Sequence, residues 1–252
     1  MNEDQSHPLI FIEKNKVKGY DVDQNQLMHI PAMIQMLHEA AMQQVLHLKV
    51  SAKELAEHQL GWILHQQYLE IFEQPKLGET IKVITHPSGK EKVFTYRDFQ
   101  MKNEAGKVLA QAASTWLLMN TATRSMATYP DFISEMLEPS NDLQHLPRAP
   151  RLRIKMQNPT WQKDYQVSFH DLDFNGHLSN FYYFKWMLDT LPSDFLQKNT
   201  LQSFQLKFKE ECHMDDLVKV KIQEEEGNSF LHVILKNEKV LAEGRTVWVG
   251  NQ

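Results

Sequence analysis

Acidic, amide and imidazole side chains recur at every second position in one short stretch, from Asp171 to His177. Apolar residues lie between them, so an extended backbone would place Asp173, Asn175 and His177 on one face. A carboxylate and an imidazole can exchange protons with a substrate or a water molecule, and an amide can hold either one. The spacing therefore predicts a site for acid–base or nucleophilic chemistry.

The stretch ends where a helix is expected to begin. An aromatic run predicts a buried helix over 181–191, which Pro192 ends. Ser179 or Asn180 would cap it with a side-chain oxygen, and the dipole at its N-terminus would favour an anion. This helix is apolar nearly all round, so a sheet must wrap it.

The remaining elements are one earlier helix and a series of strands. Apolar residues at helical spacing predict a helix at 32–48 that begins near Pro31. Alternating patterns and turn residues predict strands at 9–22, 62–72, 81–85, 93–101 and 108–119, and again at 161–169, 201–210, 217–224, 229–235 and 240–249.

The two halves of the chain repeat one pattern. Three pairs of segments match in the same order: 21–27 with 171–177 (offset 150), 77–83 with 214–220 (offset 137) and 107–110 with 239–242 (offset 132). Short deletions explain the shrinking offsets, so the sequence predicts a tandem of one fold. Between the copies lies a proline-rich segment without periodicity. We expect an N-terminal domain at 1–130, a linker at 131–157 and a C-terminal domain at 158–252.

Composition limits the class of protein. The 252 residues are 42% apolar and 23% charged, as in globular proteins, and the net charge of −5 argues against nucleic acid as the main partner. No apolar run is long enough to span a membrane, and the acidic segment Met1–Gln5 resembles neither a signal nor a transit peptide. The single cysteine, Cys212, favours a reducing, cytoplasmic location. The histidines form no zinc motif, and we expect neither metal nor cofactor.

The motif residues resemble a known family, the plant and bacterial acyl-acyl carrier protein (acyl-ACP) thioesterases. The stretch 171–180 is similar to the family's D-L-D-x-N-x-H-x-x-N, Glu211-Cys212 is similar to its Glu-Cys, and 114–120 with 123–124 extends the match into the first half. The resemblance implies an α+β tandem hot-dog fold, each unit an antiparallel sheet wrapped around one long helix. It also implies hydrolysis of the thioester between a fatty acyl chain and the phosphopantetheine arm of carrier protein.

By position, the resemblance assigns the family's functional residues to Asp173, Asn175, His177 and Glu211. We expect Glu211 to be the general base for water, His177 and Asn175 to hold water or substrate, and Asp173 to orient its neighbours. An alternative makes Asp173 a nucleophile that forms a mixed anhydride. A plainer alternative makes Asp173 and Asn175 turn formers. Backbone N–H groups of 176–179 are the expected oxyanion donors.

Cys212 presents a further alternative, a thiol nucleophile paired with histidine. Adjacent strand residues point to opposite faces, so Glu211 and Cys212 cannot both face the site on a regular strand. We expect Glu211 to point inward and Cys212 to be a small packing residue.

The first half lacks the catalytic pair. Leu27 replaces His177 and Gln74 replaces Glu211, whereas Asp23 and Asn25 remain. We expect this half to bind the acyl chain, because its helix region is rich in adaptable methionines: Met28, Met33, Met36 and Met42.

Acyl carrier protein is the expected partner. The basic segment 148–155 is either its docking patch or a solvated linker. A homodimer, an acyl-CoA thioesterase, a non-catalytic acyl-binding protein and, more weakly, a hot-dog dehydratase remain alternatives.

Overall fold

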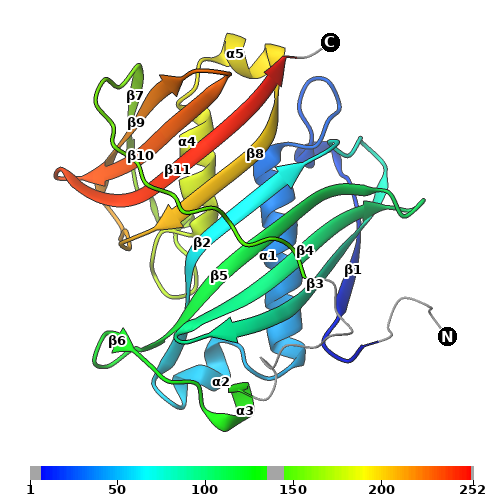
Figure 1. Ribbon diagram of the computed structural model, residues 1–252, viewed down its shortest axis with the longest axis vertical. Coiled ribbons are helices and arrows are strands. Elements are labelled where there is room, and N and C mark those ends of the chain that lie inside the picture. Colours follow the sequence, from blue (N-terminus) through cyan, green and yellow to red (C-terminus); the bar gives the residue numbers. More distant parts are fainter. Residues whose placement is uncertain (1–6, 135–144, 251–252) are drawn as a thin grey trace. The chain divides into compact units, whose positions relative to one another are not determined.

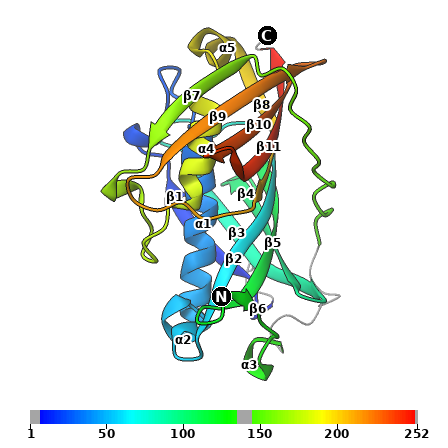
Figure 2. The ribbon, with the colours of Figure 1, turned by 90° about the vertical axis from the view of Figure 1, so that its left-hand side faces the viewer.

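The computed structural model describes residues 7–134 and 145–250 (Figures 1 and 2). The chain divides into two compact units, Met1–Arg148 and Ala149–Gln252. The acidic N-terminal segment and the middle of the expected linker, 135–144, lie outside the described residues.

The first unit contains one long helix and an antiparallel sheet. The strand order is β1-β3-β4-β5-β2, with β6 paired to β5. Its elements are β1 (Phe11–Lys16), α1 (Ile30–His47), α2 (Ala52–Ala56), β2 (Leu60–Ile71), β3 (Thr80–Glu91), β4 (Phe94–Asn103), β5 (Val108–Asn120), β6 (Ser125–Met126) and α3 (Asp131–Ser134).

Local sequence explains the placement of α1. Pro31 occupies the first turn, where a missing N–H costs nothing. The apolar side chains of Met33, Ile34 and Leu37 are fully buried, because this helix face lies against the sheet. Figure 2 shows α1 running along one face of the sheet.

The second unit repeats this arrangement. The strand order is β8-β11-β10-β9-β7, again antiparallel. The elements are β7 (Trp161–Gln166), α4 (Asn180–Asp189), α5 (Ser193–Lys198), β8 (Asn199–Phe208), β9 (Leu217–Glu225), β10 (Ser229–Lys236) and β11 (Lys239–Gly250). In the core, the ring of Phe184 on α4 packs edge-on against Phe204 of β8, with 5.0 Å between centroids.

Matching hydrogen bonds confirm the sequence repeat. Gly78 N donates to Val17 O at 3.0 Å, and Asp215 N donates to Val167 O at the same distance. These pairs are related by the offsets 137 and 150 that the sequence gives. Each unit is an antiparallel sheet wrapped around one long helix, so the predicted α+β tandem hot-dog fold is confirmed.

Candidate active site

The stretch that carries the predicted site forms a turn, as the turn-forming alternative expects, and not the extended backbone that would align its polar side chains on one face. Strand β7 ends at Gln166, and 169–171 form a single 3-10 turn. Gly176 then adopts φ +75°, a left-handed conformation that glycine accepts without a Cβ clash. The alternating polar pattern arises from a compact turn, in which side chains bond to the backbone.

Asp173 is the centre of this turn. Its Oδ1 accepts hydrogen bonds from the backbone N–H of Asn175 (2.8 Å) and of His177 (3.1 Å). Its own N–H donates to His177 O at 2.7 Å. The side-chain amide of Asn175 donates to Asp173 Oδ2 at 3.4 Å, so it faces the carboxylate of its own turn. Asp173 therefore holds the backbone that presents His177.

The first unit contains the same turn without a histidine. Asp23 Oδ1 accepts from the N–H groups of Asn25 (2.8 Å) and Leu27 (3.0 Å). The aspartate and asparagine of the repeat thus have a structural use that needs no imidazole. This observation favours the turn-forming interpretation of Asp173 over the nucleophile alternative.

His177 and Glu211 meet across two separate segments of the second unit. The imidazole Nδ1 lies 3.7 Å from the carboxylate Oε1, and both side chains are about one-quarter exposed. This distance is too long for a direct hydrogen bond. A partly exposed imidazole and carboxylate at this separation can share a water molecule and accept its proton.

Backbone contacts fix the separation of the two segments. Leu178, which follows His177, donates its N–H to the carbonyl oxygen of Cys212, which follows Glu211, at 2.8 Å. Tyr183 on α4 donates its hydroxyl to Glu210 O at 3.2 Å. The fold therefore positions the His177–Glu211 pair through neighbours on both sides.

The expected oxyanion donors are already used. The four N–H groups of 176–179 donate within the protein, to Asp173 O, Asp173 Oδ1, Cys212 O and Asp171 O respectively. Ser179 is the N-cap of α4, but it makes no side-chain cap bond. The N–H groups of Asn180 and Phe181 lie in the first helical turn, where no intrahelical acceptor exists. The N–H groups of Asn180 and Phe181 are therefore the candidate donors to an anion at this helix N-terminus.

Cys212 is buried and free, as predicted, although the argument from alternating strand faces does not explain it. Strand β8 ends at Phe208, so the alternation of strand faces does not apply at Glu211 and Cys212. Burial raises the pKa of the Cys212 thiol to about 11. A thiol that is buried and protonated at neutral pH is a poor nucleophile.

His213 is a neighbour that the sequence analysis missed. Its exposed ring lies edge-on to His177, with 5.0 Å between ring centroids. The one signal in the sequence was its position, only two residues after Glu211. Glu211, His177 and His213 offer ligand atoms within 4.8 Å of one another, in a set that suits a metal ion.

The equivalent positions in the first unit carry no such group. Leu27 occupies the place of His177, and Gln74 donates its side-chain amide to Met28 O at 2.9 Å. Met28 N donates to Pro75 O at 2.8 Å, which matches the Leu178–Cys212 bond. The two units share this backbone hydrogen bond, and of the two sets of matched positions only that of the second unit carries the imidazole and the carboxylate.

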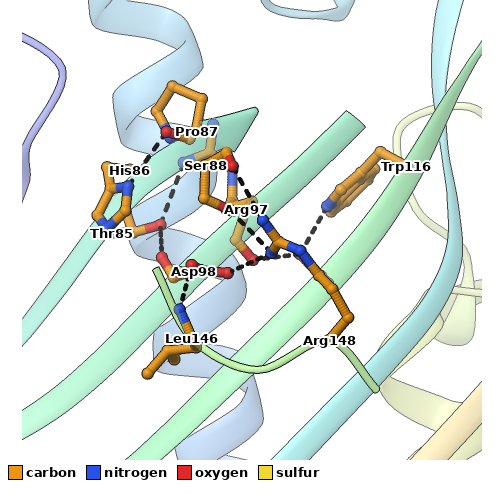
Figure 3. Close-up of polar contacts among 10 residues, drawn as sticks. Thr85, His86, Pro87, Ser88, Arg97, Asp98, Trp116, Leu146 and Arg148 are labelled. Atoms are coloured by element: carbon orange, nitrogen blue, oxygen red, sulfur yellow. Dashed lines mark hydrogen bonds and ion pairs between the residues drawn. The ribbon is translucent and has the colours of Figure 1, made fainter. Parts of the chain in front are cut away.

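The basic segment divides into two parts. Arg148 belongs to a polar network of the first unit (Figure 3). Its guanidinium contacts Asp98 Oδ1 (3.0 Å) and Ser88 O (2.9 Å) and lies 4.2 Å from the centroid of the Tyr96 ring. Asp98 is only 2% exposed, so Arg148 neutralises a buried carboxylate. The other cations, Arg151, Arg153 and Lys155, are exposed.

Comparisons with known proteins agree with this arrangement. Residues 8–137 match the acyl-ACP thioesterase N-terminal domain, and residues 154–250 match its C-terminal domain. The chain is 26% identical to oleoyl-acyl carrier protein thioesterase 1 of Arabidopsis thaliana, over 83% of this chain and 62% of that protein. It is 24% identical to a palmitoyl-acyl carrier protein thioesterase of Cuphea hookeriana, over 95% of this chain and 62% of the relative.

Solved structures show the same fold. A putative oleoyl thioesterase from Lactobacillus plantarum superposes with a TM-score of 0.88 at 24% identity, covering 96% of this chain and 97% of the other. The 12:0-ACP thioesterase from Umbellularia californica superposes with a TM-score of 0.87 at 20% identity, covering 97% of this chain and 99% of the other.

The chain spans about 62% of the length of the curated relatives named above. Within residues 7–134 and 145–250, no helix combines the length and apolar character that a membrane span needs. The matched domains cover most of the sequence, and the chain belongs to the acyl-ACP thioesterase family.

Proposed function

We propose that the chain hydrolyses fatty acyl-ACP thioesters to free fatty acid and holo carrier protein. The observation that supports this most is the His177–Glu211 pair, which stands on a backbone that the first unit repeats without either group. The curated relatives described above are named acyl carrier protein thioesterases. This chain has the imidazole and carboxylate, His177 and Glu211, that the proposed hydrolysis uses.

In the proposed reaction, Glu211 takes a proton from water while the water oxygen attacks the thioester carbonyl carbon. His177 orients this water or the substrate. The N–H groups of Asn180 and Phe181 stabilise the oxyanion, because both point from the N-terminus of α4. The carbon–sulfur bond then breaks, and the proton held by Glu211 passes to the leaving thiolate.

Asp173 and Asn175 support the reaction through the turn. Asp173 holds the His177 backbone, and Asn175 closes the turn through its bonds to Asp173. The second N–H of the Asn175 amide is the proposed donor to the water or to the carbonyl oxygen. Asp173 is in this scheme a positioning residue.

The first unit is proposed to hold the acyl chain. Met28 and Met33 are fully buried, and Met36 and Met42 are half-buried along α1. Flexible thioether side chains can rearrange around chains of different length. The proposed domains are an N-terminal domain at 1–130, a linker at 131–157 and a C-terminal domain at 158–252. The ranges that match the two family domains support this division, because the first ends at 137 and the second begins at 154.

Acyl carrier protein is the proposed partner. Arg151, Arg153 and Lys155 are exposed and alternate with the less accessible Leu152 and Ile154, so the cations share one side of an extended segment. Carrier protein is acidic, and a basic stripe would speed its encounter.

A homodimer and a cytoplasmic location are also part of the proposal. The second unit exposes several large apolar side chains that a contact with a second copy would cover: Phe169, Phe174, Met214 and Leu217. The free thiol of Cys212 favours a reducing compartment. The curated relatives named above are chloroplastic proteins by name. Sedimentation equilibrium and fluorescent fusions in the host cell test these two points.

The function is tested by product analysis on a panel of acyl carrier proteins from short to long chains, with the matched acyl-CoA series as comparison. We expect free fatty acid from the carrier-bound substrates, with kcat/KM at least tenfold above that for acyl-CoA. A kcat/KM on acyl-CoA that equals or exceeds the value on carrier-bound substrate would instead identify the protein as an acyl-CoA thioesterase. Tight acyl binding without release of acid would make the chain a binding protein.

A further inference from the structure

Three metal-ligand side chains gather at one point of the second unit. His177, Glu211 and His213 each present a nitrogen or oxygen atom, and all three atoms lie within 4.8 Å of one another. The two imidazoles lie edge-on, with 5.0 Å between ring centroids. The chain positions of His177 and His213 match no zinc motif, because the fold alone brings them together.

The backbones that carry these side chains are anchored. His177 N donates to Asp173 Oδ1 at 3.1 Å, and His213 N donates to Asp216 Oδ2 at 2.9 Å. Lys236 forms an ion pair with Asp216 at 2.6 Å, so the second anchor is itself held. The side chains of His177 and Glu211 are partly exposed and that of His213 is exposed, so an ion can reach all three from solvent.

Two imidazoles and one carboxylate form a donor set that binds zinc. Zinc binds histidine nitrogen and carboxylate oxygen at roughly 2.0–2.2 Å, and three protein ligands leave a fourth position for water. Tetrahedral geometry at such bond lengths puts ligand atoms about 3.3 Å apart. Ligand atoms within 4.8 Å therefore need only side-chain rotation to close around an ion.

We infer that His177, Glu211 and His213 form a binding site for a zinc ion, and that zinc there inhibits the enzyme. Inhibition rests on the proposed function, because the ion would take the lone pairs of Glu211 and His177 that water activation requires. His213 is outside the proposed reaction and contributes only to the metal site.

The first unit offers an internal comparison. By the repeat, Leu27, Gln74 and Lys76 stand at the positions of His177, Glu211 and His213. An alkyl chain, a neutral amide and a lysine cation do not make a zinc site. Within residues 7–134 and 145–250, the three ligands thus occur together in the second unit and not at the matching positions of the first.

The test measures zinc binding to the full-length protein by isothermal titration calorimetry, with zinc chloride as titrant. The variant is His213→Ala, and His170→Ala removes another exposed histidine of the same unit as the control. We expect one zinc per chain, at least about tenfold weaker binding in His213→Ala, and no change in His170→Ala. Equal zinc affinity in His213→Ala and the unchanged protein overturns the site.

An activity assay separates this inference from the proposed function. Zinc should inhibit the unchanged protein, a chelator should restore its rate, and the rate of His213→Ala, compared with the same variant without zinc, should resist zinc. If zinc binding depends on His213 but zinc does not slow turnover, the metal site stands. His177 and Glu211 are then not part of catalysis. Melting temperatures of both variants verify that they are folded.

Discussion

Asp173 Oδ1 lies 3.1 Å from the backbone nitrogen of His177, and the carboxylate thus orders the residue that carries the imidazole. Asp23 makes the equivalent bond to Leu27 at 3.0 Å, where no imidazole follows. The aspartate therefore orders the turn in both units. Only in the second unit does the ordered turn carry a histidine.

The paired turns predict different outcomes for matched variants. Asp173→Ala and Asp23→Ala should each lower the free energy of unfolding by about 1–3 kcal/mol, since each removes two bonds to a charged acceptor. Only Asp173→Ala should reduce kcat, because only its turn positions a histidine. Asp173→Asn keeps an Oδ1 acceptor and should retain most activity. Loss of all turnover in a folded Asp173→Asn variant would instead support the mixed-anhydride alternative.

Cys212 should be dispensable for catalysis. Burial raises the pKa of its thiol to about 11, so the protein carries almost no thiolate at neutral pH. Treatment of the native protein with iodoacetamide should leave kcat unchanged, and Cys212→Ala should stay within a few-fold of the original rate. Inactivation that parallels labelling of Cys212, located by mass spectrometry, would identify it as a nucleophile.

His232 should make the second unit sensitive to acid. Burial lowers its pKa from 6.5 to about 3, and its Nε2 lies 2.8 Å from Thr246 Oγ1. Between these pH values the unfolded chain holds a proton that the folded protein does not. Stability should therefore fall as pH drops below about 6.5, by about 1.4 kcal/mol per pH unit.

The matched variant for this effect is His232→Gln, which keeps a polar partner for Thr246 and does not titrate. Denaturant unfolding at pH 4.5 to 7.5 should show a shallower pH slope for the variant. Identical slopes would mean that His232 does not carry the acid sensitivity.

The basic segment should separate into a docking part and a structural part. Charge reversal of Arg151, Arg153 and Lys155 should raise KM for carrier-bound substrate and weaken its salt dependence, because these cations are exposed. Arg148→Ala should mainly lower the melting temperature, since it leaves the buried Asp98 without its cation. An unchanged KM after the triple reversal would make the exposed segment a solvated linker.

The sequence predicted the fold well because its signals are local. Apolar spacing and Pro31 place α1, and the repeat offsets relate the Gly78–Val17 bond of the first unit to the Asp215–Val167 bond of the second. Periodicity of one helix or strand is contained in its own residues, so no tertiary contact was needed to read it.

The site was harder to predict because its details depend on tertiary contacts. The alternation around Asp173 resembles a strand, and only bonds from a side chain to nearby N–H groups reveal a turn. The use of the N–H of Leu178 depends on Cys212, which is distant in sequence. The approach of His213 to His177 has the same origin. Such pairings follow from the fold and not from spacing along the chain.

In the proposed reaction, Glu211 is the base that activates water. Single-turnover and steady-state hydrolysis of acyl carrier protein substrate by Glu211→Gln test it most directly, with Glu210→Gln as control, because Glu210 is exposed and ion-paired with Lys239 at 2.7 Å. We predict that Glu211→Gln lowers kcat by about 10²–10⁴-fold with an unchanged melting temperature, and that Glu210→Gln keeps its rate. A folded Glu211→Gln variant with kcat within about threefold of the unchanged protein would rule out Glu211 as the base.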